Sequence, residues 1–263
     1  MPELLTDPSM WRLDTFLVPP GSLATGEVVL EGDEGHHAAR VVRIRPGALA
    51  RVTDGEGVEA IGRVTRVAQR APCEAVLEVV ELRAHKREDG TSLTIAQGLL
   101  KERSFDEVVR RCGELGVSEV VPVATARAQV RAPSRARLAR WRAVAAAALK
   151  QSRGVFLTRV SDPLTFDALL DRVGSSPWAC VAWEEERAAH LREALRTAAA
   201  PNGRRTAMLA VVGPEGGLTS EEVAALGRAG ATAVTLGPRV LKADWAAAAL
   251  AAAVACESGR LLP

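Results

Sequence analysis

Gly213-Pro214-Glu215-Gly216-Gly217 decides the fold of this chain, together with a second stretch, Leu236-Gly237-Pro238-Arg239-Val240-Leu241-Lys242. Each stretch follows an apolar, strand-like run, residues 208–212 in the first case and 233–235 in the second, and each leads into a helix-like segment. Two strand–loop–helix turns this close in sequence are expected to lie side by side at one edge of a parallel sheet. Ligands of α/β proteins bind at that edge.

The sequence around these loops alternates between strand-like and helix-like segments from Ser92 onwards. Such alternation predicts a parallel sheet covered by helices on both faces. Thr219 with Glu222, and Ser104 with Glu107, have the spacing of capping boxes at helix starts. The expected strands are 93–97, 117–124, 179–183, 208–212 and 233–236, and the expected helices are 104–115, 135–151, 185–197, 219–229 and the segment that begins at 243.

The first 85 residues have a different pattern, with short valine-rich runs separated by turn residues. Asp54-Gly55 between two such runs is a hairpin signal. The expected strands are 27–31, 49–53, 58–67 and 74–82. Residues 83–91 are polar and read as a linker, so the sequence predicts a small closed β-domain over 1–85 and an α/β domain over 86–263.

Charge is distributed unevenly although the net charge is only +2 over 263 residues. The segment from Arg127 to Arg153 contains basic residues and no acid. A stripe of this kind suits a polyanion such as RNA, because each phosphate that is neutralised releases counterions. A solvated, arginine-rich helix face is the alternative. The basic residues are Arg127, Arg131, Arg135, Arg137, Arg140, Arg142, Lys150 and Arg153.

The cysteines indicate a reduced, cytoplasmic protein without a structural metal. Cys73, Cys112, Cys180 and Cys256 are isolated from one another, and no Cys/His pair has zinc spacing. The N-terminus lacks the apolar core of a signal peptide. The longest apolar run, 245–256, is about 12 residues, well short of the ~20 that a membrane span needs.

The chemistry of the two loops favours a ligand without phosphates. Glycine lets a ligand approach the backbone, and the helix opened by Thr219 points free N–H groups back toward the first loop. The spacing fits neither a dinucleotide-binding fingerprint nor a P-loop. S-adenosylmethionine fits better, since it carries no phosphate and its sulfonium charge suits nearby acids such as Glu215, Asp244 or Glu184. An ordinary β–α turn without a ligand is the alternative.

Motifs along nearly the whole chain resemble those of the RsmE family, SPOUT-class methyltransferases that modify uridine N3 in small-subunit ribosomal RNA. The two loops are the most specific of them. The others are the start at 12–18, His36-His37 with the residues up to Gly47, the turn at 54–57, Gln97-Gly98-Leu99-Leu100-Lys101, the segment 112–117 and Gln151-Ser152-Arg153.

The resemblance implies a PUA-like N-terminal β-barrel domain for RNA and a C-terminal SPOUT α/β domain with a deep trefoil knot. It also implies a homodimer with the knot helices, here Asp244 to Cys256, near the interface. S-adenosylmethionine would be the cofactor, and 16S ribosomal RNA of the small subunit the partner. The cofactor residues would be Ala182, Trp183, Val212, Gly213, Glu215, Gly217, Leu236, Gly237, Pro238, Val240 and Leu241. The RNA-binding residues would be Arg12, His36, His37, Arg40, Arg43, Lys101, Arg127 and Arg131.

Methyl transfer to uracil N3 requires that the N3 proton leave, and nearby cations favour the resulting anion. Arg239, Lys242 and Arg103 are the candidate cations. Asp244 is a candidate general base, and a helix-start acid is the equal alternative for it. His36 and His37 would contact RNA or serve the structure. Arg40 and Arg43 lie three apart, on one helix face if this segment is helical, and better fit phosphate contacts.

One segment departs from the family pattern. Where the family typically has Arg-Thr-Glu-Thr after the leucine of the second loop, this chain has Lys242-Ala243-Asp244-Trp245. The change replaces two hydroxyls and places an indole beside the expected cofactor site. Two further hypotheses therefore stay open: a diverged SPOUT paralogue that methylates another RNA, and a catalytically silent RNA-binding or ribosome-assembly protein.

Overall fold

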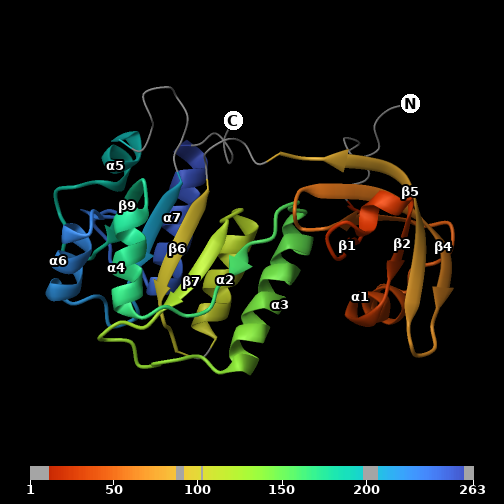
Figure 1. Ribbon diagram of the computed structural model, residues 1–263, viewed down its shortest axis with the longest axis horizontal. Coiled ribbons are helices and arrows are strands. Elements are labelled where there is room, and N and C mark those ends of the chain that lie inside the picture. The colour runs from red at the N-terminus through yellow and green to blue at the C-terminus, as the bar shows by residue number, and fades with distance from the viewer. Residues whose placement is uncertain (1–11, 87–91, 102, 198–206, 258–263) are drawn as a thin grey trace. The chain divides into compact units, whose positions relative to one another are not determined.

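The computed structural model describes residues 12–86, 92–101, 103–197 and 207–257. The chain divides into two compact units (Figure 1). The first unit comprises Met1–Arg87 together with Leu149–Leu157, and the second comprises Glu88–Ala148 and Thr158–Pro263. The inclusion of 149–157 in the first unit is a feature that the sequence pattern did not predict.

The first unit is built on a five-stranded sheet in the order β1-β3-β4-β5-β2. All of its pairings are antiparallel except that of β1 with β3. Its strands are β1 (Thr15–Leu17), β2 (Glu27–Leu30), β3 (Leu49–Thr53), β4 (Val58–Ala68) and β5 (Glu74–Ala84). The four strands expected from the valine-rich runs are thus confirmed to within two residues, and β1 was not expected.

The turn between β3 and β4 confirms the predicted hairpin. The Asp54 carboxylate accepts hydrogen bonds from the backbone N–H groups of Glu56 (2.8 Å) and Val58 (2.9 Å). Gly57 N–H donates to the Val155 carbonyl at 2.8 Å, which ties the turn to the 149–157 segment. This segment belongs to the first unit because backbone hydrogen bonds of this kind hold it there.

A short helical segment follows β2 and carries the His-His motif. It consists of α1 (Gly32–His36), continued by a wider, π-helical turn over His37–Val42. Arg43 ends the turn in the left-handed conformation, at φ 56°. The condition for Arg40 and Arg43 to share a helix face is therefore not met, since Arg43 lies beyond the last helical residue.

The second unit contains a six-stranded sheet in the order β11-β9-β10-β6-β7-β8, and every neighbouring pair is parallel. This confirms the α/β reading of the alternating pattern. The strands are β6 (Leu93–Gly98), β7 (Glu119–Val123), β8 (Arg159–Val160), β9 (Trp178–Ala182), β10 (Met208–Val212) and β11 (Thr232–Val234). Four of these strands are buried almost throughout, as expected of a sheet covered on both faces.

Helices cover both faces of this sheet (Figure 1). One face packs against α4 and α6 in a cluster that includes Leu169, Val211 and Leu226. Alternate strand residues face the other way, where α7 lies against β6 and β10 and also packs on α2. The helices are α2 (Ser104–Glu114), α3 (Arg135–Ser152), α4 (Phe166–Ser175), α5 (Leu191–Thr197), α6 (Ser220–Arg228) and α7 (Ala243–Glu257).

Helix starts were predicted with mixed success. The capping box of α6 is confirmed, with Thr219 and Glu222 bonding each other's backbone N–H groups. The capping box proposed for α2 is wrong: Arg103 occupies the cap position without a side-chain bond, and Ser104 is already helical. In addition, α5 begins later than expected and α4 was not expected at all.

Most of the basic residues between Arg127 and Arg153 have partners inside their own unit. Arg140 pairs with Asp106, Arg142 with Asp162 at 2.9 Å, and Lys150 with Glu34 at 2.5 Å. Arg137 donates to the Leu100 carbonyl at 2.9 Å. The acids missing from the local sequence are therefore supplied by distant elements, which favours a structural role for much of the stripe.

Burial raises the pKa of the Cys112 and Cys180 thiols to about 12, so both are neutral and inert at physiological pH. Within the four described ranges, no helix is long and apolar enough to span a membrane. In the same residues, no group of three or more His, Cys, Asp or Glu side chains is arranged to hold a metal ion.

Glu119 fixes the edge of the sheet, and its replacement by glutamine is expected to destabilise the protein at neutral pH. Its buried carboxylate forms an ion pair with Arg159 at 2.8 Å and another with Arg172, and it accepts a hydrogen bond from the Ser161 hydroxyl. Burial raises the pKa of Glu119, but the hydrogen bonds from Arg172, Ser161 and Arg159 outweigh burial and hold it below its usual value. We expect a loss of about 1–3 kcal/mol, limited by the solvent exposure of Arg159.

The pH dependence follows from the direction of that shift. A lowered pKa in the folded state contributes stability above the unfolded value, about 4.3, and this contribution disappears as pH falls through the folded pKa. Urea unfolding should therefore show a larger difference between wild type and Glu119→Gln at pH 7 than at pH 3.5. Glu114→Gln, at an exposed position, is the control. An equal difference at both pH values would contradict the ion-pair explanation.

Candidate cofactor and active site

The two predicted loops meet at the carboxyl ends of three neighbouring strands. In the sheet, Val212 at the end of β10 is in register with Ala182 of β9 and with Gln97 of β6. The loop that follows β10 and the loop that follows β11 enclose a cavity of about 600 Å³. Its size is in the usual range for a small-molecule site, and it lies where α/β sheets bind ligands.

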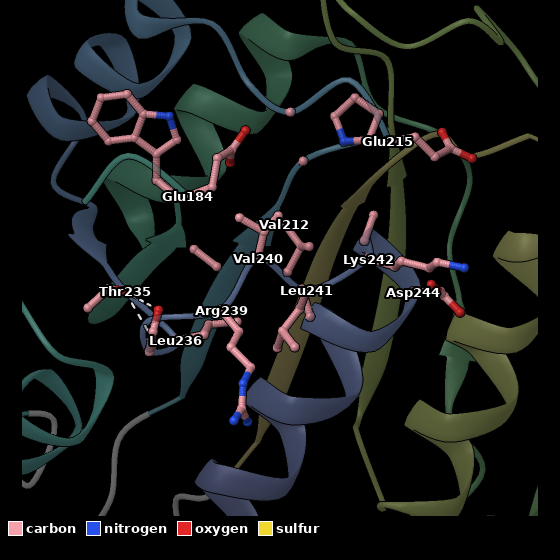
Figure 2. A pocket seen from close by; sticks show the side chains of 18 of the residues that line it. Glu184, Val212, Glu215, Thr235, Leu236, Arg239, Val240, Leu241, Lys242 and Asp244 are labelled. Atoms are coloured by element: carbon pink, nitrogen blue, oxygen red, sulfur yellow. Dashed lines mark hydrogen bonds between the residues drawn. The ribbon is translucent and has the colours of Figure 1, made fainter. Parts of the chain in front are cut away.

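The cavity brings together every residue that the sequence analysis assigned to the cofactor, from Ala182 to Leu241. Of the four candidate catalytic residues, Arg239, Lys242 and Asp244 line it as well. Arg103 does not line it, although the next residue, Ser104, does. In Figure 2, Glu184 and Glu215 lie along the upper side of the pocket and Leu236 and Arg239 along the lower side.

Two residues at the end of β6, Gln97 and Gly98, contact the first loop, and neither had an individual role in the sequence analysis. Gln97 is fully buried, and its amide donates to the Gly213 carbonyl at 2.8 Å. A Cβ on Gly98 would lie 2.6 Å from Pro214 N and 2.9 Å from the carbonyl carbon of Gly213. Only a glycine at 98 lets the loop approach β6 this closely. The motif Gln97-Gly98 was quoted from the sequence, but nothing there showed that it touches a loop more than a hundred residues away.

Two acidic side chains also fix the position of the first loop: Glu215, which belongs to it, and Glu184, which packs on it. Glu215 accepts a hydrogen bond from Lys101 N–H at 2.9 Å. The Glu184 carboxylate packs on Gly217, where an added Cβ would lie 2.2 Å from Oε1 and the backbone has φ 70°. A side chain at 217 would therefore be strained and would also collide with Glu184. The loop places negative charge, backbone amides and apolar walls around one cavity.

The second loop forms the opposite wall. Thr235 Oγ1 accepts a hydrogen bond from Gly237 N–H at 3.2 Å and shapes the turn, with Gly237 at φ 116°. Beyond it Val240 is 79% exposed, so this apolar side chain stands at the open edge of the cavity rather than in the core. In Figure 2 the Arg239 side chain extends away from both Glu184 and Glu215. Neither of these two carboxylates therefore pairs with it.

Asp244 lies in the first turn of α7, and the Lys242 carbonyl begins that helix by accepting from Trp245 N–H (2.9 Å) and Ala246 N–H (2.8 Å). The Asp244 carboxylate pairs with Arg111 of α2 at 2.8 Å. The sequence left two roles open for Asp244, general base and helix-start acid, and this ion pair favours the structural one. A carboxylate held by a guanidinium anchors the second loop to α2. Arg111 was not foreseen, because only the packing of α2 on α7 brings it here.

The predicted RNA-binding residues divide between the two units. In the first unit Arg12, His36, Arg40 and Arg43 are exposed. His37 is half-buried, with its ring 5.9 Å from that of Phe16, which favours a packing role for His37.

In the second unit Lys101 and Arg131 are exposed. The Arg127 guanidinium donates to the carbonyls of Gly216 and Leu218, each at 3.2 Å. Arg127 therefore supports the first loop from outside the cavity, whatever else it binds.

Sequence comparison places the two units in known families. The family described as RNA methyltransferase domain matches residues 87–255, and the family described as RNA methyltransferase PUA domain matches 30–78. Ribosomal RNA small subunit methyltransferase E of Mycobacterium bovis is 34% identical over 241 residues, which cover 90% of this chain and 89% of the relative. The Bacillus subtilis protein of the same name is 29% identical, covering 82% of this chain and 85% of its own.

Comparison with solved structures identifies a relative of the same name. The crystal structure of ribosomal RNA small subunit methyltransferase E from Neisseria gonorrhoeae, bound to S-adenosyl methionine, superposes with a TM-score of 0.80 at 26% identity. The match covers 93% of this chain and 98% of that one. The parallel sheet, the paired loops and both family matches thus lead to one conclusion: this chain belongs to the ribosomal RNA small subunit methyltransferase E (RsmE) family of RNA methyltransferases.

Proposed function

We propose that this protein is an S-adenosylmethionine-dependent methyltransferase that acts on 16S ribosomal RNA of the small subunit. The observation that carries the proposal is the cavity at the carboxyl ends of β9, β10 and β6, lined by both glycine-containing loops. Relatives named as small-subunit RNA methyltransferases match both units of the chain.

The residues of the cavity fit S-adenosylmethionine. Leu236, Val240 and Leu241 offer apolar walls for an adenine-like ring, while Glu184 and Glu215 supply negative charge for a sulfonium. When bound, the cofactor would supply an electrophilic methyl group. The chain's own contribution is to hold that group in line with its acceptor and to exclude misaligned geometries.

We propose uracil N3 as the acceptor, with Arg239 and Lys242 favouring loss of the N3 proton. Positive charges near an acid lower its pKa and stabilise negative charge spread onto the ring oxygens. We assign Asp244 a positioning role, because its carboxylate is paired with Arg111. Arg103 lies outside the cavity lining, so a direct role for it would require contact with the RNA beyond the cofactor.

The remaining assignments concern RNA and assembly. We propose that residues 1–85 form the RNA-binding domain, with exposed Arg12, His36 and Arg40 as contacts. A homodimer is also proposed, and the exposed apolar side chains of Val240 and Leu241 are consistent with a covered surface. The trefoil knot stays a prediction from the resemblance.

The proposal is tested by incubating the protein with labelled S-adenosylmethionine and small ribosomal subunits from a strain that lacks the family's modification. Digested RNA is then analysed for nucleosides by mass spectrometry. We expect 3-methyluridine to appear. Transfer of label to a different nucleoside would contradict the N3 assignment, and cofactor binding without any transfer would contradict the enzymatic proposal and favour a silent RNA-binding protein.

Glu184→Gln is expected to weaken S-adenosylmethionine binding about two- to five-fold and to leave S-adenosylhomocysteine binding unchanged. The two ligands differ by the sulfonium charge, and an exposed carboxylate contributes only a modest, screened attraction. Isothermal titration with both ligands at low and high salt measures the difference. Glu185→Gln is the matched control, since Glu185 is exposed and lies outside the cavity lining. Equal loss for both ligands would show that Glu184 acts through loop shape.

A further inference from the structure

The end of β9 and the loop that follows it form a third wall of the cavity. Ala182, Trp183, Glu184 and Arg187 line the cavity from this side. In this loop only Glu184 had a predicted charge role, so Arg187 is a cation at the site without an assigned function. The wall presents one acid and one base, close together in the sequence, to a bound ligand.

Glu186 fixes the shape of this loop. Its Oε1 accepts hydrogen bonds from the backbone N–H groups of Arg187 (2.8 Å), Ala188 (2.7 Å) and Ala189 (3.1 Å). The bonds from Ala188 and Ala189 lower the pKa of Glu186, so its carboxylate is ionised at neutral pH and continues to accept them. The Ala189 carbonyl in turn accepts from Thr235 N–H at 2.8 Å, at the start of the second loop. The backbone of Arg187 is therefore fixed relative to the second loop.

The Arg187 side chain folds back on its own loop. Its Nη1 donates to the Glu184 carbonyl at 2.5 Å and to the Glu186 carbonyl at 3.4 Å. Both partners are neutral carbonyl oxygens, and within the four described ranges the guanidinium forms no ion pair. No bonded carboxylate neutralises its charge, and the Nε and Nη2 donors remain for a ligand.

We propose that Arg187 binds the α-carboxylate at the amino-acid end of S-adenosylmethionine. The inference rests on the proposed function and adds to it the subsite for that end of the cofactor. In the cofactor a negative carboxylate lies a few bonds from the positive sulfonium. In the wall the guanidinium of Arg187 is bonded to the backbone of Glu184, the acid proposed for the sulfonium. A guanidinium can bind a carboxylate through two parallel N–H···O bonds, which lysine cannot do.

Two other cations line the cavity, Arg239 and Lys242, and their positions favour Arg187 for this role. In Figure 2 the Arg239 side chain extends away from Glu184, while Lys242 lies across the pocket from Glu184, beside Asp244. Because only a few bonds separate the carboxylate of the cofactor from its sulfonium, the partner of the carboxylate must lie near Glu184. Arg187 meets this condition.

An RNA phosphate is the competing partner of Arg187, and the neighbouring acid argues against it. A phosphodiester is negative and carries no compensating positive group, so Glu184 would repel it. The amino-acid end of the cofactor instead offers one charge of each sign to a wall that has one charge of each sign. Charge complementarity therefore favours the cofactor.

The test measures, by isothermal titration of the full-length protein, the binding of S-adenosylmethionine and of its decarboxylated analogue, which lacks only the carboxylate. We expect Arg187→Gln to weaken S-adenosylmethionine binding about 5- to 30-fold and to change binding of the analogue by less than about 2-fold, because charge-assisted hydrogen bonds at an exposed site are worth this much. Arg187→Lys keeps the charge but not the paired donors and should fall between. Arg192→Gln, at an exposed position outside the cavity lining, is the control.

Equal weakening of both ligands would overturn the carboxylate subsite and show that Arg187 only holds the loop. Unchanged cofactor binding with a higher KM for small ribosomal subunits would also overturn it and identify an RNA contact. If Lys242→Ala abolished the difference between the ligands and Arg187→Gln kept it, the subsite would belong to Lys242. Wild-type protein that bound neither ligand would refute both the proposed function and the subsite, whereas the expected difference in binding without methyl transfer would refute the enzyme alone.

Discussion

Replacing Arg239 by alanine is expected to lower kcat about 100-fold or more, while the Kd for S-adenosylmethionine changes by less than about 3-fold. Arg239 lines the cavity, its side chain is exposed, and among the described residues it has no ion-pair partner. A cation without an internal partner is free to stabilise charge that develops on the base during methyl transfer. Removal of one group that stabilises charge developing in the transition state typically costs 10²–10³-fold in kcat.

Single-turnover methylation of small subunits gives the chemical step, and isothermal titration gives cofactor affinity. Arg192→Ala is the control, because Arg192 is an exposed arginine of the same unit that lies outside the cavity lining. Among the described residues its one ion pair is with Glu257, at 3.9 Å. If kcat/KM and cofactor affinity fell equally for Arg239→Ala, the residue would be a binding group and not a stabiliser of the transition state.

Gly98→Ala is expected to weaken S-adenosylmethionine binding by at least about 10-fold and to destabilise the protein by about 1–3 kcal/mol. The new Cβ would lie 2.6 Å from Pro214 N and 2.7 Å from its Cδ. Both contacts involve the backbone or ring of the first loop, which cannot rotate away as a flexible side chain would. The loop must therefore move from β6, and the cavity must change shape with it.

Titration calorimetry and thermal unfolding measure these two effects together. Gly227→Ala in α6 is the matched control, since a Cβ there meets nothing within 4 Å. That change should leave binding intact and raise stability slightly, because alanine is the better helix former. Normal cofactor binding in Gly98→Ala would show that the loop tolerates displacement and that its close approach to β6 does not shape the site.

Much of the site could be predicted because its residues are continuous in the sequence. The loops after β10 and β11 each follow a strand of the same parallel sheet, and the loops at the carboxyl ends of such strands share one edge. The predicted cofactor residues accordingly line one cavity. Local patterns also gave the strand spans and the Thr219 capping box, since backbone preferences and burial periodicity act within a few residues of one another.

Other features depended on contacts between distant segments. The acid-free stretch from Arg127 to Arg153 looked available to RNA, yet Asp106, Asp162 and Glu34 pair with members of it. No local pattern distinguishes a free arginine from one whose acid arrives from another element. The same holds for Arg40 and Arg43, whose helix face is lost where Arg43 adopts a left-handed conformation.

By itself, the sequence determined the parallel sheet, the edge at which its loops meet and the chemical character of that edge. These follow from strand burial, from glycine at turns and from helix capping, all of which are local. Tertiary structure alone decided that Gly98 supports the first loop and that Glu184 packs on Gly217. It also decided that Arg111 forms an ion pair with Asp244 and a cation–π contact with Trp245. The physical reason is that steric fit and ion pairing act over a few ångströms in space, whatever the separation of the partners along the chain.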